Sequence, residues 1–280
     1  MSDAHDESRD DTPSESSNPF DHITPDSTNT SLADASAGPP SGEPAHPMQV
    51  RIHLPERRPI VSYTLIGITV LVFLAQMASN NLLGGDYPAA LGMKINDFIQ
   101  AGQYWRFITP VLLHGNILHI GVNMYSLYVI GPGLERHYGH WQFLLLYVVC
   151  GITGVAASVI FSDANSLGAS TAIFGLLGAY GALLFQNRRI FSGARAALNQ
   201  VLRVAALNLL LGLAPGIDNW GHMGGLLGGV IVGLIGGPIY AVVRGEIPGI
   251  HLENQRPQSL LLVAGIAVAA VFVAAALFLI

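Results

Sequence analysis

Residues 141–161 read WQFLLLYVVCGITGVAASVIF and contain no charged side chain. A helix of about 20 mostly apolar residues is long enough to cross the hydrocarbon core of a bilayer. This run therefore predicts a membrane-spanning helix, and the segments on either side of it repeat the pattern.

Six further segments share this apolar character. The weakest is residues 198–214, because Arg203 lies inside it and has to extend its guanidinium to an interface. The predicted spans are residues 60–79, 114–134, 141–161, 166–186, 198–214, 220–240 and 259–280. Residues 80–113 are too polar to span and too aromatic for a plain linker, so we expect them to lie at one interface.

The composition supports a membrane protein. Of the 280 residues, 51% are hydrophobic and 11% are charged, whereas about 25% are charged in an ordinary soluble domain. This balance excludes a secreted disulfide scaffold, a basic nucleic-acid-binding domain and a disordered main body. The single cysteine, Cys150, excludes an intramolecular disulfide and a cysteine-based metal cluster. We expect an all-α polytopic protein in a lipid bilayer, with no nucleic-acid partner.

Residues 1–50 have a different composition from the rest. They hold ten acidic residues and one basic residue, together with nine Ser and seven Pro. Such a segment cannot bury enough apolar surface to offset its ordering entropy, so we expect a disordered cytoplasmic tail. It lacks the basic start and apolar core of a signal peptide.

The basic residues predict an orientation. With the N-terminus in the cytoplasm, only Lys94 and Arg106 fall outside. The other eleven fall inside: Arg9, Arg51, Arg57, Arg58, Arg136, Arg188, Arg189, Arg195, Arg203, Arg244 and Arg256. Basic residues favour the cytoplasmic side. We therefore expect a plasma (inner) membrane protein with residues 241–258 as a cytoplasmic loop and an extracytoplasmic C-terminus.

Three polar clusters stand at the starts of the second, fourth and sixth spans. They are HGNILHIGVN at 114–123, GAST at 168–171 and NWGHMGG at 219–225. Polar groups inside spans are costly and usually face a cavity or a partner. These three spans run in the same direction in the predicted topology, so their starts share one side of the membrane and one depth.

Ser170 and His222 have the chemistry of a nucleophile and its base. A serine needs a neighbouring base to attack at neutral pH, and no Asp or Glu lies in spans three to six to complete a triad. His119 and Asn123 are four residues apart on one helix face and could stabilise an oxyanion, with the Ser170 backbone N–H as a further donor. The pattern predicts a Ser–His dyad that needs neither metal nor cofactor.

Small residues would let these helices approach closely. Gly225 belongs to a series at four-residue spacing in the sixth span, and Phe174 lies one turn after Ser170, where it could pack on the imidazole. Each feature alone has a structural alternative. A serine in a span usually bonds to the carbonyl four residues earlier, and a lone histidine is more often a buried structural residue.

Taken together, the motifs resemble the rhomboid family of intramembrane serine proteases over residues 60–240. The similarity rests on His119 and Asn123, on Gly168 with Ser170, and on His222 followed by spaced glycines. A Trp-Arg pair matches Trp105 and Arg106, and a turn between Gly131 and Gly139 carries Glu135 and Arg136. The pattern departs from the family at Thr171, where many members have Gly, and at Gly221, where Ala often precedes the histidine.

The resemblance implies a six-helix catalytic core in residues 51–240 and an added seventh helix at 259–280. It also implies cleavage of single-pass membrane proteins near their outer membrane boundary. The fifth span and the loop after it would gate lateral access. The main alternative is a weak or inactive relative that binds transmembrane clients without cutting them. The sequence leaves the substrate and the oligomeric state open.

Other functions fit the motifs less well. A channel or transporter could use His114, His119 and His222 as a proton or metal path, but the chain shows no inverted repeat. A zinc-type intramembrane protease needs His-Glu-x-x-His, which is absent. An aspartyl type needs two Asp within spans, and a haem protein would need paired histidines on facing helices.

Overall fold

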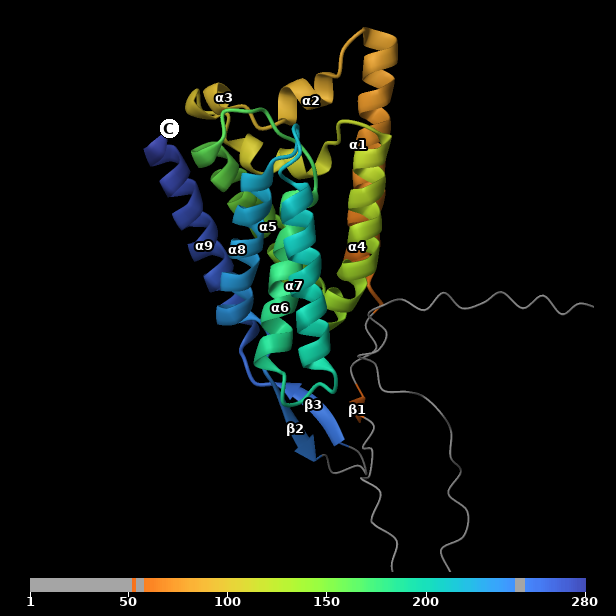
Figure 1. Ribbon diagram of the computed structural model, residues 1–280, viewed down its shortest axis with the longest axis vertical. Helices are drawn as coiled ribbons and strands as arrows, with labels where there is room; N and C mark the ends of the chain where they lie inside the picture. The colour runs from red at the N-terminus through yellow and green to blue at the C-terminus, as the bar shows by residue number, and fades with distance from the viewer. Residues whose placement is uncertain (1–51, 54–57, 245–249) are drawn as a thin grey trace, which may run out of the picture.

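The computed structural model describes residues 52–53, 58–244 and 250–280. The predicted acidic tail, residues 1–50, lies outside this part of the chain. The described part is mostly helical, and its long helices run side by side as a bundle (Figure 1). This confirms the predicted helical polytopic fold.

Seven long helices correspond one to one with the predicted spans. They are α1 (Ile60–Leu83), α4 (Ile117–Tyr138), α5 (His140–Phe161), α6 (Ser170–Gln186), α7 (Ala194–Leu211), α8 (Asn219–Gly236) and α9 (Gln258–Leu279). Within the described residues, α1, α4, α5 and α9 are long and apolar enough to cross a membrane by length and composition. The protein is therefore a multi-pass membrane protein.

The other three long helices are too short or not apolar enough to meet this criterion for crossing a membrane. Helix α6 is apolar but has 17 residues. Helix α7 carries Arg195 and Arg203, and α8 has seven glycines among 18 residues, which lower its hydropathy. Helices α6 and α8 pack against each other and against α5, which places them in the middle of the bundle. Crossings by α6, α7 and α8 remain predictions.

Residues 80–113 fold into short pieces at one end of the bundle. Helix α1 first continues to Leu83, and then α2 (Tyr87–Gly92), α3 (Asn96–Gln100), η2 (Tyr104–Phe107) and η3 (Thr109–Leu112) follow. The C-terminus reaches this same end (Figure 1), where the Gln100 side-chain amide donates to the Ile280 carbonyl at 3.3 Å. We call this region the first loop.

At the opposite end, the described residues include three short strands that the sequence analysis did not predict. Strands β1 (Ile52–His53), β2 (Tyr240–Arg244) and β3 (Ile250–Asn254) form a sheet in the order β1-β3-β2 (Figure 1). The β2–β3 pair is antiparallel, with Val242 opposite Leu252, and β1–β3 is parallel. Strand β2 directly follows an apolar helix, and five residues are too few for alternation to be recognised in sequence. The expected loop at 241–258 thus contains most of a hairpin.

Several span boundaries differ from the prediction by three or four residues, and two of them have a clear local cause. Helix α6 begins at Ser170 instead of residue 166, because Gly168 has φ 135° and turns the chain before the helix. Helix α8 ends at Gly236 instead of Tyr240, because Pro238 follows and cannot donate to the helix ladder. The first of these boundaries puts Ser170 in the first helical position.

Candidate active site

Ser170 is held at the start of α6 by the loop before it. The Gly168 amide donates to the Pro110 carbonyl at 2.9 Å, and Ala169 is the N-cap residue. The first amides of a helix have no partner within the helix and carry partial positive charge. The Ser170 hydroxyl therefore lies next to backbone N–H groups that favour negative charge.

His222 faces this hydroxyl from the first turn of α8. Its Nε2 lies 2.9 Å from the Ser170 Oγ, and the imidazole is 8% exposed. The Phe174 ring is stacked on it, with centroids 4.3 Å apart and planes 9° apart. The three side chains thus lie together, as the sequence analysis expected, and the stacking fixes the plane of the imidazole.

Glycines set the distance between α6 and α8. A Cβ on Gly225 would overlap the Thr171 carbonyl oxygen, and one on Gly229 would overlap the Gly175 carbonyl oxygen. A Cβ on Gly178 would overlap the Leu226 carbonyl in the same way. Backbone therefore meets backbone along this contact, which we call the glycine seam. Because backbone atoms cannot move aside, the seam fixes how far Ser170 lies from His222.

Helix α4 brings His119 to the same place. Its Nε2 and the Ser170 Oγ lie 2.7 Å and 3.6 Å from the point where a Cβ on Gly168 would be. The Gly115 amide points to His119 Nδ1 at 3.4 Å. If Nδ1 accepts, the neutral imidazole carries its proton on Nε2, the nitrogen that lies against Gly168. Gly168 leaves the space through which the two side chains approach.

Asn123 lies one turn further along α4 and is 5% exposed. Its side-chain amide donates to the His119 carbonyl at 2.9 Å. An amide nitrogen has two hydrogens, so one N–H remains for another acceptor. Helix α4 packs directly on α6, the helix that begins at Ser170. The free N–H of Asn123 therefore lies on a helix next to the proposed nucleophile.

Known proteins resemble this chain mainly over its central region. A family model of the rhomboid domain matches residues 101–239, which include all the side chains described above. The chain is 39% identical over 173 residues to the rhomboid protease GluP of Bacillus subtilis (strain 168). The chain belongs to the rhomboid family.

Plant rhomboid-like proteins match as well. The chain is 36% identical over 186 residues to RHOMBOID-like protein 5 of Arabidopsis thaliana, and 38% over 132 residues to its RHOMBOID-like protein 6, mitochondrial. The match to GluP covers 61% of this chain and 34% of GluP. The match to RHOMBOID-like protein 5 covers 63% of this chain and 60% of that protein, and the match to RHOMBOID-like protein 6 covers 47% and 43%. This rhomboid therefore matches only part of each relative.

Trp105 and Arg106 of this rhomboid hold the first loop together. Arg106 is 2% exposed and donates to the carbonyl oxygens of Met93 at 2.6 Å and Ala90 at 2.9 Å. Trp105 is half exposed, and its indole donates to the Leu91 carbonyl at 3.0 Å. These bonds satisfy carbonyls at and just after the end of α2, which has no further helical turn to do so. Both residues contact backbone of the first loop and not Ser170.

Lys94 is a buried residue that the sequence analysis used only for orientation. It is 0% exposed, and its ammonium donates to the carbonyl oxygens of Ser162 at 2.5 Å and Ala164 at 2.9 Å. Its backbone also pairs with Ser166. Burial lowers the pKa of Lys94, while the negative charges of Asp218 and Asp163 oppose that shift. Lys94 thereby ties the first loop to the segment that leads to Ser170.

His114 and Asp218 also reach the site without having been assigned to it. His114 is 1% exposed, lies edge-on to His119 and accepts from the Ala169 amide at 3.4 Å. Asp218 is the N-cap of α8, accepting from the Gly221 amide at 2.9 Å. The spacing Asp-x-x-Gly-His at a helix start is a sequence signal for the second residue. The role of His114 depends on tertiary contacts that no spacing reveals.

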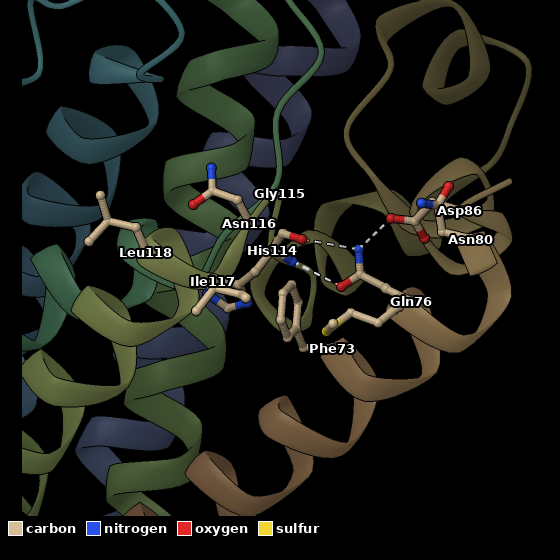
Figure 2. A pocket seen from close by; sticks show the side chains of 10 residues that line it. Phe73, Gln76, Asn80, Asp86, His114, Gly115, Asn116, Ile117 and Leu118 are labelled. Atoms are coloured by element: carbon tan, nitrogen blue, oxygen red, sulfur yellow. Dashed lines mark hydrogen bonds between the residues drawn. The ribbon is translucent and has the colours of Figure 1, made fainter.

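A cavity of about 620 Å³ borders the segment before α4. Figure 2 shows Gln76 of α1 reaching this segment, where it bonds to the His114 backbone amide at 3.0 Å and carbonyl at 3.2 Å. The same side chain donates to Asp86 at 2.8 Å. Neither Ser170 nor His222 lines the cavity. Its lining supports the histidine-bearing segment from the α1 side and is separate from the Ser170–His222 pair.

Proposed function

We propose that this rhomboid is an intramembrane serine endopeptidase that cleaves single-pass membrane proteins near their outer membrane boundary. The observation that carries the proposal is the 2.9 Å contact between Ser170 Oγ and His222 Nε2. A serine hydroxyl within hydrogen-bond reach of an imidazole is the arrangement that activates serine as a nucleophile. The stacked Phe174 ring and the glycine seam keep that arrangement in place.

The first half of the reaction forms an acyl-enzyme. Ser170 Oγ attacks the substrate carbonyl carbon while its proton moves to His222 Nε2, and the carbonyl π electrons move to oxygen. When the tetrahedral intermediate collapses, the C–N bond breaks and the imidazolium donates its proton to the leaving amine. Water then repeats the cycle: it loses a proton to His222, attacks the ester, and releases the acid and Ser170.

The oxyanion formed in each half needs donors that are already in position. The Ser170 backbone N–H at the start of α6 is one candidate. The remaining N–H of Asn123 and the Nε2–H of His119 are the others, because α4 carries both residues and packs on α6. Such preorganised donors act where water is excluded and need no reorganisation during the reaction.

We also propose that substrates approach through the side of the bundle closed by α7. This helix has three buried residues among 18, and four of its leucines are more than half exposed. The site would face the extracytoplasmic side of the plasma membrane, because Arg188, Arg189 and Arg195 lie between α6 and α7 or at the start of α7, at the opposite end of the bundle.

The test is cleavage of a transmembrane reporter by the purified protein in liposomes. Ser170→Ala and His222→Ala should each abolish cleavage, because members of such a pair act as a unit. A fluorophosphonate probe should label the wild-type protein and not Ser170→Ala. If Ser170→Ala binds the reporter and the wild type binds without cutting, the protein is a client-binding relative and the protease proposal is wrong.

Orientation is tested separately with single cysteines in a Cys150→Ser background. A cysteine at Ser162, in the loop between α5 and α6, should react with an impermeant thiol reagent in intact cells. A cysteine at Ser192, in the loop between α6 and α7, should react only after lysis. The reverse pattern would place Ser170 at the cytoplasmic face.

A further inference from the structure

Three polar atoms at the start of α8 are sealed from solvent without a hydrogen-bond partner among the described residues. They are Oδ2 of Asp218, Oδ1 of Asn219 and Nδ1 of His222, and the first and last of them bear on the proposed base. The other oxygen of Asp218 caps the helix, and the other nitrogen of His222 faces Ser170. Buried polar atoms without a partner are rare. A carboxylate oxygen and the second nitrogen of the proposed base therefore call for a joint explanation.

The local backbone brings the two side chains into one turn. The His222 amide donates to the Asp218 carbonyl at 3.1 Å, so the residues stand in the i, i+4 relation in which side chains are neighbours on a helix. A Cβ on Gly221 would lie 2.8 Å from Asp218 Oδ2 and 3.0 Å from Thr171 Cγ2. The free oxygen is thus directed into the space between α6 and α8. A residue larger than glycine at 221 would displace it.

Among the groups that face His222, Asp218 is the carboxylate whose charge acts on the imidazole. Helix α6 presents the uncharged Ser170 and Phe174, and α4 presents His119, whose positive form would repel an imidazolium. Asp218, the N-cap residue of α8, attracts the imidazolium. Lys94 of the first loop also attracts Asp218, but no ion pair between them forms among the described residues, so the carboxylate charge is not fully neutralised.

We propose that Asp218 is a positioning residue for His222, acting through its negative charge on the side of the ring away from Ser170. The charge favours the tautomer with the proton on Nδ1, which leaves Nε2 free to accept from Ser170. It also stabilises the imidazolium that forms as Ser170 attacks. This inference rests on the proposed protease function and adds a third residue to the pair.

Asp218→Asn separates charge from structure. Asparagine caps helices as well as aspartate does, so thermal stability should stay close to wild type. Losing the charge makes the imidazolium harder to form. The acid limb of the kcat–pH profile should then move down by about one pH unit. The rate at pH 7 should fall by about threefold to tenfold because the base is weaker, with KM unchanged.

Asp163→Asn is the matched control. Asp163 is an exposed carboxylate in the loop before Ser170 and also attracts Lys94. The substitution therefore removes one negative charge from the same end of the bundle as Asp218→Asn does. Its profile should superimpose on wild type. Asp218→Ser, a second neutral cap, should reproduce the shift of Asp218→Asn, and it decides the matter if the asparagine variant does not fold.

The outcomes distinguish this inference from the proposed function. If wild type cleaves the reporter and both neutral-cap variants give the wild-type pH profile, Asp218 only caps α8 and the inference is wrong. An equal shift in Asp163→Asn would mean a general surface-charge effect and would also overturn it. If the wild type neither cleaves nor reacts with the fluorophosphonate, the protease function itself fails.

Discussion

Helices α6 and α7 are consecutive and nearly equal in length, but the bundle holds them very differently. Thirteen of the 17 residues of α6 are buried, against three of the 18 of α7. Helix α6 meets α8 backbone to backbone along the glycine seam, whereas a Cβ added to Gly181 would meet only side chains of α7, Val201 at 3.5 Å and Leu198 at 3.8 Å. The proposed chemistry thus lies on a close backbone contact and the proposed substrate route on a looser side-chain contact.

The contrast has a physical basis. A proton transfer between Ser170 and His222 requires heavy atoms within about 3 Å, and backbone contact is the least deformable way to hold two helices. A substrate route instead needs a helix that can be displaced at small energetic cost. Few buried apolar residues make such local displacement easy.

The largest effect should come from adding one methyl group to the seam. Gly225→Ala places a Cβ on the Thr171 carbonyl oxygen, which cannot move without shifting α6. We expect a loss of about 3 kcal/mol or more in the free energy of unfolding, the upper end for overpacking, with loss of cleavage. Thermal melting and reporter cleavage measure the two effects.

Gly181→Ala is the control for that experiment, because it is the same change on the α7 side of α6. The nearest atom to the new methyl would be 3.5 Å away. Replacing a helical glycine there should be neutral or should stabilise by up to about 1 kcal/mol. If the two alanine variants melted alike, the seam would not differ from the α7 contact.

Asn123→Ala should affect the rate without affecting the seam. Losing one oxyanion donor costs about 2.7–4 kcal/mol of transition-state stabilisation, or about 10²–10³ in kcat. The melting temperature should change little, because the lost bond is local to α4. A rise in KM at constant kcat would instead show that Asn123 only binds substrate.

Sequence alone predicted the helices and the Ser170–His222 pair because both depend on local signals: uncharged runs of span length, and polar clusters at the starts of three parallel spans. It could not predict that Lys94 is buried and bonded to the Ser162 and Ala164 carbonyls, because burial of a single lysine follows from tertiary packing. It also missed the hairpin of β2 and β3. The start of α6 at Ser170 depends on the positive φ of Gly168, which a run of small residues does not specify.

Lys94→Met asks whether the seam alone holds Ser170 in place. The variant keeps the stem but leaves the Ala164 carbonyl without its donor and the Ser162 carbonyl with the Asn96 amide alone. We expect a loss of about 2 kcal/mol in the free energy of unfolding and a severalfold fall in kcat, measured by melting and reporter cleavage. Arg188→Met, which removes an exposed cation from the far end, is the control. An unchanged kcat would mean that the hydrogen bonds of Lys94 are not needed to position Ser170.

The smallest effect should come from the link between α8 and the end of α7. The Asn219 side chain, at the start of α8, donates to the Leu209 carbonyl at 3.1 Å. Asn219→Ala removes a bond worth about 1 kcal/mol, which favours displacement of α7 by about fivefold. We expect cleavage of the transmembrane reporter to rise by up to that factor, with fluorophosphonate labelling of Ser170 unchanged because the small probe needs no displaced helix. Asn208→Ala is the matched control, because within the described part of the chain the Asn208 side chain donates only to Val204 of its own helix. A fall in reporter cleavage with Asn219→Ala, or an equal rise with Asn208→Ala, would contradict access through α7.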